Sequence, residues 1–141
     1  MPKIPIQNIY MLVAYQFAKL SYAKRRQVGC VIVKDKQVIS FGYNGTPHGF
    51  ENCCEVDDVT KKEVLHAESN AITKVAKSTI GCGGAELFTT TAPCFECSKI
   101  IIQSGIKTVY YSETYRDISG IELLEQANIK VIRLEIDKND R

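Results

Sequence analysis

Residues 87–112 read LFTTTAPCFECSKIIIQSGIKTVYYS, and the pattern predicts a strand, a helix and a second strand in succession. The first strand, over 87–91, is rich in β-branched threonine. Pro93 suits the start of the helix over 94–103, because its missing N–H needs no partner in the first turn. Gly105 then ends the helix, as glycine often does past the last turn. Two strands linked through a helix run parallel, with a right-handed crossover.

Beyond this unit, hydrophobic periodicity predicts further helices and strands on both sides. The polar connection of residues 35–37 is so short that the strands it joins must be antiparallel. Ser119 and Glu122 form an S-x-x-E pattern, which predicts a capping box at the start of the last helix. Residues 53–63 are polar and give no clear assignment. In chain order the expected elements are a helix over 4–23, strands over 28–34 and 38–43, a helix over 66–77, a strand over 87–91, a helix over 94–103, a strand over 106–112, a helix over 119–127 and a strand over 128–136.

These elements predict an α/β fold of three layers, with helices on both faces of a sheet. The sheet should be mixed and five-stranded, with its first two strands antiparallel and its last three parallel. The 141 residues suit one domain, and we expect a single domain over 1–141. With 45% apolar and 24% charged residues, the composition excludes disordered, collagen-like and low-complexity proteins.

The formal net charge of +2 argues against a nucleic-acid scaffold, because such domains are strongly basic. The longest apolar run near the N-terminus, residues 9–15, is far shorter than the about 20 residues of a membrane-spanning helix. We therefore expect neither nucleic-acid nor membrane partners, and a cytoplasmic location. Six cysteines in a reducing compartment favour metal, catalytic or core roles over disulfides. Of these, Cys30 and Cys82 are expected in the core.

The most informative pattern is HAE at 66–68 followed by PCFEC at 93–97. Cys94 and Cys97 are three residues apart on one helix, so both sulfurs share a face. Each half opens a helix, so the two helix N-termini can meet at one edge of the sheet. Zinc prefers thiolate and imidazole ligands, and three protein ligands with an open fourth position make a catalytic site. We therefore expect His66, Cys94 and Cys97 to bind Zn²⁺, with the helix N-terminus stabilising the thiolates.

Glu68 lies two residues from His66, a spacing that suits an acid/base residue better than a fourth ligand. Zinc lowers the pKa of a bound water from ~16 toward ~7, and Glu68 is placed to take its proton and pass it on. The pattern H-x-E…P-C-x-x-C is the signature of zinc-dependent nucleobase deaminases. Two alternatives remain open. One is a structural zinc site with Cys53, Cys54 or Cys82 as fourth ligand, and the other is a redox pair that leaves His66 and Glu68 without a role.

With these motifs, the sequence resembles the zinc-dependent cytidine deaminase superfamily, and within it the deoxycytidylate (dCMP) deaminases of phage or bacterial type. The segment GYNGTP at 42–47 is the one most particular to those enzymes. The resemblance implies a cytidine deaminase-like fold, a Zn²⁺ cofactor and hydrolytic deamination of dCMP to dUMP, the precursor of thymidylate. Glu68 would protonate N3 of the cytosine and then the leaving amine. The matching segments are VGCVIVK (28–34), GYNGTPHGFENC (42–53), HAESNAI (66–72), TAPCFEC (91–97) and IIQSGIKTVYYSETYRD (101–117).

The resemblance also implies the substrate contacts. The backbone of Ala67 holds the pyrimidine edge. Asn44 hydrogen-bonds the sugar hydroxyl, for which its amide offers both donor and acceptor groups. Two of these assignments have a structural alternative. Asn44 could serve only to shape its turn, and the basic run 24–26 could be the solvated end of the first helix. The residues expected at the 5′-phosphate are Arg26, Tyr115 and Arg116.

The resemblance further implies a hexamer that dCTP activates and dTTP inhibits, with Mg²⁺ accompanying the triphosphate. The expected partners are therefore dCMP, dCTP, dTTP and further copies of the chain. Some relatives bind a second zinc through extra Cys and His residues before the HAE motif. Here no histidine lies between Cys53 and His66, which puts that second site in doubt. The expected regulatory residues are Lys24, Asn44, Gly45, Gly49, Phe50 and Asn52.

Other deaminases and one non-enzymatic class compete with this interpretation. A tRNA adenosine deaminase or a polynucleotide cytidine deaminase needs a basic channel with stacking aromatic residues. The small net charge and the absence of tryptophan argue against both. A deaminase of free cytidine would have no use for Arg26 or Arg116. A zinc-stabilised structural binding module would have no use for Glu68.

Overall fold

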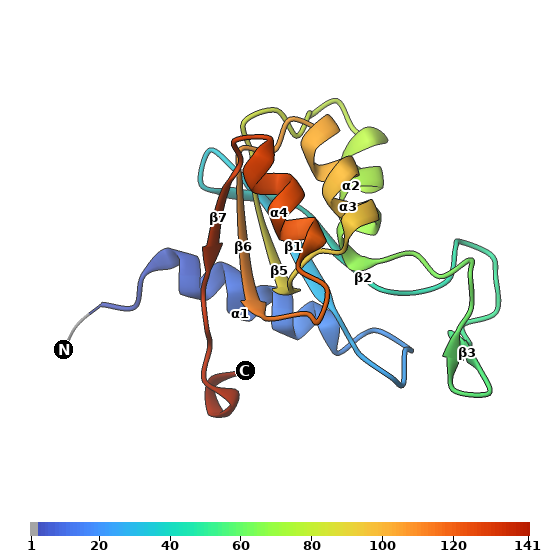
Figure 1. The fold of residues 1–141 in the computed structure, drawn as a ribbon. Helices are drawn as coiled ribbons and strands as arrows, with labels where there is room; N and C mark the ends of the chain where they lie inside the picture. The colour runs from blue at the N-terminus through green and yellow to red at the C-terminus, as the bar shows by residue number, and fades with distance from the viewer. Residues whose placement is uncertain (1–2) are drawn as a thin grey trace.

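Five strands form the central sheet of the computed structural model, which describes residues 3–141 (Figure 1). The strands are β1 Gly29–Lys34, β2 Gln37–Tyr43, β5 Glu86–Thr91, β6 Thr108–Glu113 and β7 Lys130–Arg133. Their spatial order is β2-β1-β5-β6-β7. β1 is antiparallel to both β2 and β5, whereas β5, β6 and β7 are parallel. The predicted mixed sheet is confirmed.

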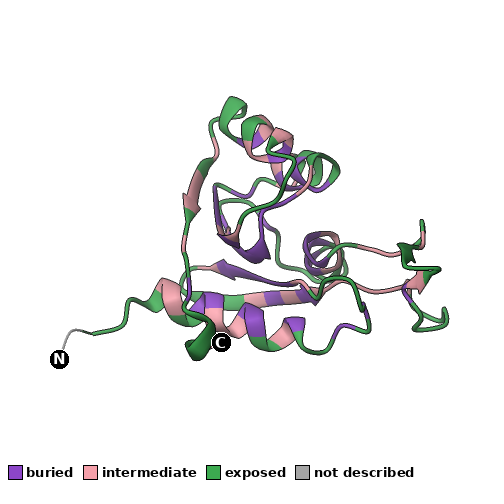
Figure 2. Cartoon of the chain, turned by 60° about the horizontal axis from the view of Figure 1, so that its bottom comes forward, coloured by how far each residue is buried: buried purple, intermediate pink, exposed green. Residues whose placement is uncertain are grey.

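Helices cover both faces of the sheet and complete the three predicted layers (Figure 1). Along β1, Val31 and Val33 pack with the helix on one face, whereas Cys30 and Ile32 pack with the helices on the other. This alternation is the period of two of a strand buried on both faces. Buried residues accordingly concentrate between the layers (Figure 2). The single helix on the first face is α1 Ile6–Ala18, and the second face carries α2 Ala67–Ala76, α3 Phe95–Gln103 and α4 Ser119–Gln126.

Two cysteines were expected in the core, and the structure places both of them there. Cys30 and Cys82 are both buried among apolar side chains of the second face, as predicted. No helix within residues 3–141 combines the length and the apolar character needed to cross a membrane.

The first helix ends earlier than the sequence predicted. α1 stops at Ala18, not at residue 23. The Ser21 hydroxyl donates to the carbonyl of Asn44 at 2.7 Å and accepts the N–H of Ala23 at 3.1 Å. These bonds hold the chain on a non-helical path after α1. The basic run 24–26 is therefore part of a loop that leads to β1, and the reading of it as a helix end is wrong.

The start of α4 also differs from the prediction. Ser119 is the first helical residue and not the cap, so the expected capping box with Glu122 does not form. The Asp117 carboxylate accepts the Ser119 N–H at 2.9 Å instead. The last strand is shorter than the predicted 128–136, because Asn128 has a φ of 62° and belongs to the turn after α4.

A small hairpin occupies the stretch that the sequence left unassigned. β3 Glu55–Val56 and β4 Val59–Thr60 pair antiparallel across a two-residue turn. Both turn residues, Asp57 and Asp58, have a positive φ, which a tight hairpin turn requires and aspartate tolerates. The hairpin lies apart from the central sheet and its helices (Figure 1).

Gly42 in β2 allows α2 to approach the sheet closely. A Cβ added at Gly42 would lie 2.6 Å from the amide nitrogen of Ala71 and closer still to the carbonyl oxygen of Ala67. Both atoms belong to the backbone, so neither can move aside as a side chain would. The first turn of α2 therefore rests directly on β2.

Replacing Gly42 should destabilise the fold through this contact. We expect Gly42→Ala to lower the free energy of unfolding by about 3 kcal/mol, because the helix must shift away from the strand. Gly83→Ala is the matched control, since a Cβ there meets no atom within 4 Å, and it should stay within about 1 kcal/mol of the wild type. Equal urea denaturation midpoints for both variants would contradict the close contact.

Candidate metal centre and active-site cavity

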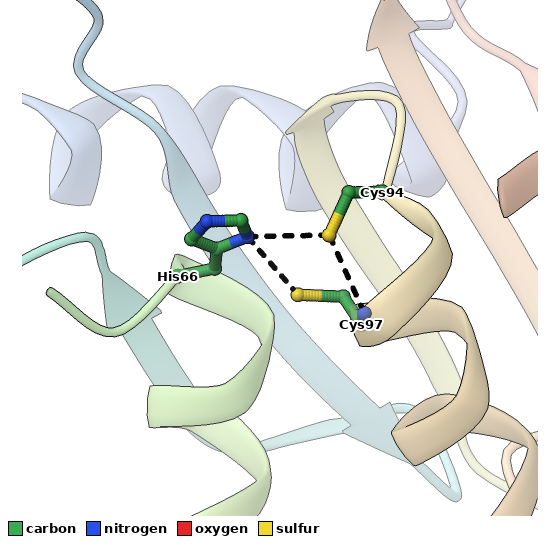
Figure 3. A group of neighbouring side chains, drawn as sticks. All are labelled: His66, Cys94 and Cys97. Carbon is green, nitrogen blue, oxygen red and sulfur yellow. Dashed lines mark hydrogen bonds between the residues drawn. The ribbon is translucent and has the colours of Figure 1, made fainter. Parts of the chain in front are cut away.

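Three metal-ligating side chains meet where α2 and α3 begin (Figure 3). His66 is the N-cap residue of α2, Cys94 is the N-cap residue of α3, and Cys97 lies in the first turn of α3. The His66 Nδ1 atom lies 3.4 Å from the Cys94 Sγ atom and 3.2 Å from the Cys97 Sγ atom. The three residues predicted from the sequence are therefore brought together from two helices.

The spacing of these atoms fits a tetrahedral zinc ion. Bonds of about 2.3 Å to sulfur and about 2.0 Å to nitrogen place such ligands about 3.6 Å apart. The observed nitrogen–sulfur separations are slightly shorter. Within residues 3–141, no other group of three or more such side chains comes together. A structural site would need a fourth soft ligand, and the candidates Cys53, Cys54 and Cys82 lie outside the group.

Electrostatics at the helix start favour a thiolate. The Cys97 N–H donates to the Cys94 Sγ atom at 3.4 Å, and the N-terminal end of a helix favours negative charge. Hydrogen bonds from the Cys97 thiol and from His66 lower the pKa of Cys94 to about 4. The hydrogen bond with Cys94, together with burial, raises the pKa of Cys97. The hydrogen bond with Cys94 also raises the pKa of His66, against the effect of burial. Binding of a metal would favour the deprotonated form of both cysteines, because thiolates and not thiols are the ligands.

Glu68 lies in the first turn of α2 and is only 3% exposed. Its Oε1 atom lies 3.1 Å from the hydroxyl of Thr89. Burial raises the pKa of the Glu68 carboxyl, while the charge of His66 and the hydrogen bond from Thr89 oppose this shift. A carboxyl with a raised pKa exchanges a proton more readily near neutral pH, which is the property that acid/base catalysis requires.

A cavity of about 500 Å³ is lined by two of the metal ligands and by several basic side chains. This volume is typical of a site for a small molecule. His66, Cys94 and Glu68 form part of the wall. The residues that the sequence analysis assigned to the substrate all line the same cavity; they are Arg26, Asn44, Ala67, Tyr115 and Arg116.

The basic part of the cavity includes a residue that the sequence analysis did not single out, Arg25. The Glu55 carboxylate in the small hairpin accepts the backbone N–H groups of Lys24 at 2.9 Å and of Arg25 at 3.2 Å. Arg26 forms an ion pair of 3.7 Å with Glu113 at the end of β6. The loop that carries the arginines is therefore held from two sides. Neither contact could be predicted from a local sequence pattern, because the partners are far apart along the chain.

Asn44 uses its side chain to hold this loop. Its Oδ1 atom accepts the N–H of Val28 at 2.9 Å, and its Nδ2 atom donates to the carbonyl of Arg26 at 2.8 Å. The amide therefore shapes the turn, which was one of the two roles that the sequence suggested for Asn44. It still retains one N–H and one lone pair, and the residue lines the cavity.

A second cavity, of about 240 Å³, lies at the loop that follows β2. Gly45 and Leu65 exchange backbone hydrogen bonds of 3.0 and 2.7 Å, which join this loop to the segment that precedes His66. Lys24, one of the expected regulatory residues, does not line this cavity; its backbone N–H donates to the Glu55 carboxylate. The other expected regulatory residues line it, and they are Asn44, Gly45, Gly49, Phe50 and Asn52.

All six cysteines are free thiols. Cys53 is exposed and its thiol donates to the carbonyl of Glu55 at 3.1 Å, whereas Cys54 is buried and lines the large cavity. Neither belongs to the metal group. The role of Cys54 in the cavity wall had no signal in the sequence, since it depends on where the small hairpin sits.

Comparisons with known proteins agree with this geometry. The family model for the cytidine and deoxycytidylate deaminase zinc-binding region matches residues 6–113. ComE operon protein 2 of Bacillus subtilis is 40% identical over 144 residues, with 98% of this chain and 76% of the relative covered. A deoxycytidylate deaminase of Saccharomyces cerevisiae is 36% identical, but the chain spans only 46% of that protein. The crystal structure of a dCMP deaminase from the cyanophage S-TIM5 with dCMP and dUMP superposes with a TM-score of 0.90 at 45% identity, covering 95% of this chain and all of the other.

Proposed function

The chain belongs to the cytidine and deoxycytidylate deaminase family, and from this premise we propose that it catalyses the zinc-dependent hydrolysis of dCMP to dUMP and ammonia. The observation that carries the proposal is a single cavity lined by two of the metal ligands, the buried Glu68 and several arginines. A nucleotide with one phosphate needs both kinds of group, the metal centre for its base and cationic side chains for its phosphate. The match to a structure that holds dCMP and dUMP supports the same substrate. The reaction would supply the precursor of thymidylate, and residues 1–141 would act as one domain.

The chemistry is divided among a few residues in this proposal. Zinc held by His66, Cys94 and Cys97 would supply a Lewis acid that makes water nucleophilic near neutral pH. Glu68 takes a proton from the attacking water and delivers it to N3 of the cytosine. It then carries a proton to the amine that leaves from C4. The burial of Glu68 keeps bulk water away from this exchange.

The remaining cavity residues would hold the nucleotide in place. The backbone of Ala67 holds the edge of the pyrimidine, and the unused N–H and lone pair of Asn44 bind the sugar hydroxyl. The residues proposed at the 5′-phosphate are Arg26, Tyr115 and Arg116. Arginine side chains suit this task because their donors match phosphate oxygens in pairs.

We also propose that dCTP activates and dTTP inhibits the enzyme, with Mg²⁺ bound to the triphosphate. The second cavity supports this, because it adjoins the loop that carries Asn44 and precedes β3. Exposed apolar side chains such as Ile9, Phe95 and Ile100 support association of the chain into a homo-oligomer, for which we propose a hexamer. We further propose a cytoplasmic location, because cysteines that bind a metal are typical of a reducing compartment.

Glu68→Gln tests the central proposal. The variant should keep its zinc and its fold but lose turnover of dCMP by about 10²–10⁴-fold, because the amide cannot carry a proton. Cys97→Ser should lose both zinc and turnover, as should the wild type after treatment with a chelator. Absorbance assays with dCMP, deoxycytidine, CMP and a single-stranded oligonucleotide measure the substrate range, and elemental analysis measures the zinc. A wild-type protein that holds zinc and leaves dCMP unchanged would overturn the proposal.

Arg26→Ala tests the phosphate contact. We expect the KM for dCMP to rise about tenfold to hundredfold, since a charge-assisted hydrogen bond is lost, while the KM for deoxycytidine changes little. Arg133→Ala is the matched control, because Arg133, the last residue of β7, pairs with Glu135 and does not line the cavity. An equal change in KM for both substrates would remove Arg26 from the phosphate site.

Nucleotide regulation is measured in the same assay. Saturating dTTP with Mg²⁺ should inhibit the deamination of dCMP, and added dCTP should restore it, because both triphosphates compete for one site. Rates that respond to neither triphosphate would contradict the regulatory proposal and leave the catalytic one intact.

A further inference from the structure

We propose that Thr89 is a positioning residue whose hydroxyl fixes the carboxyl group of Glu68 for proton transfer. The proposal rests on the proposed deaminase function, in which Glu68 moves the protons. It concerns a residue of the central sheet that belongs to neither the HAE nor the PCFEC motif.

The geometry of three neighbouring groups carries the inference. Thr89 lies in β5 and is completely buried, with an exposed fraction of 0%. Its Oγ1 atom lies 3.1 Å from the Oε1 atom of Glu68 and 2.9 Å from the carbonyl oxygen of Thr91. The hydroxyl therefore joins the sheet to the one buried carboxyl of the cavity wall. One oxygen of the carboxyl is held in this way, which restricts the rotation of the Glu68 side chain.

A hydroxyl is well suited to hold a group that gains and loses a proton. It has one proton to donate and lone pairs to accept. It can donate to Glu68 when the carboxyl is ionised, and it can accept from Glu68 and donate to the Thr91 carbonyl when the carboxyl is protonated. A backbone carbonyl could hold only the protonated form, because an ionised carboxylate has no proton to donate. The two short distances from one Oγ1 atom allow both arrangements without movement of the backbone.

The adjacent residue Thr90 shows that this contact is separate from the ordinary packing of β5. Thr90 is also completely buried, but successive side chains of a strand point to opposite faces. Its Oγ1 atom accepts the backbone N–H of Gly29 at 3.1 Å. Thr90 is thus a buried threonine of the same strand as Thr89, but its hydroxyl bonds the backbone and not Glu68.

Thr89→Val, which keeps the shape and removes the hydroxyl, tests the proposal. We expect kcat for dCMP to fall about tenfold to hundredfold with KM within about threefold of the wild type, because binding is kept while the proton carrier is misplaced. Thr89→Ser should recover most of kcat. Thr90→Val should lower the melting temperature and leave kcat unchanged. Zinc content should be equal in all variants. Crystal structures of the zinc-loaded wild type and Thr89→Val should show the Glu68 carboxyl rotated in the variant.

Several results would overturn the positioning role. One is a Thr89→Val enzyme with wild-type kcat, and another is a loss of kcat that Thr90→Val shares equally. A third is an unchanged Glu68 side chain in the variant crystal. These outcomes differ from failure of the proposed function, in which the zinc-loaded wild type itself would not deaminate dCMP. If Thr89→Val does not fold, the comparison of Thr89→Ser with Thr89→Ala decides, because only the serine keeps the hydroxyl.

Discussion

His66 and Cys94 each cap a helix, and their contact fixes the N-termini of α2 and α3 against each other at one edge of the sheet. The positions of the other site residues depend on this contact between the two helix N-termini. It brings Glu68, in the first turn of α2, into the wall of the cavity. It also requires α2 to lie close to β2, which the missing side chain of Gly42 allows. The chemistry therefore depends on the backbone contact between β2 and α2 as well as on the reacting groups themselves.

The parts of the molecule that the sequence could predict are those with local signals. The strand–helix–strand unit of residues 87–112 and the spacing of Cys94 and Cys97 both follow from periodicity along a single element. The parallel order of the last strands follows from the helices between them. In each case the information lies in elements that follow one another directly along the chain, where local hydrogen-bond geometry decides the structure.

The parts that the sequence could not predict depend on long-range partners. The early end of α1 is set by the bond between Ser21 and the Asn44 carbonyl. The loop of basic residues takes its shape from Glu55, whose hairpin had no assignment at all. The capping box failed for a smaller reason: Ser119 occupies the first helical position, one residue past the place where a cap can act. A pattern identifies the residue types but not their exact register.

Glu55 of the small hairpin holds the loop of residues 24–26, and parts of both line the cavity. The cavity wall is therefore made of two kinds of structure. The reacting groups belong to the helices of the core, whereas the basic side chains that line the cavity belong to loops. Changes in those loops can therefore alter which nucleotide is accepted without disturbing the reactive groups. Such a separation lets one scaffold serve new substrates through exchange of surface segments alone.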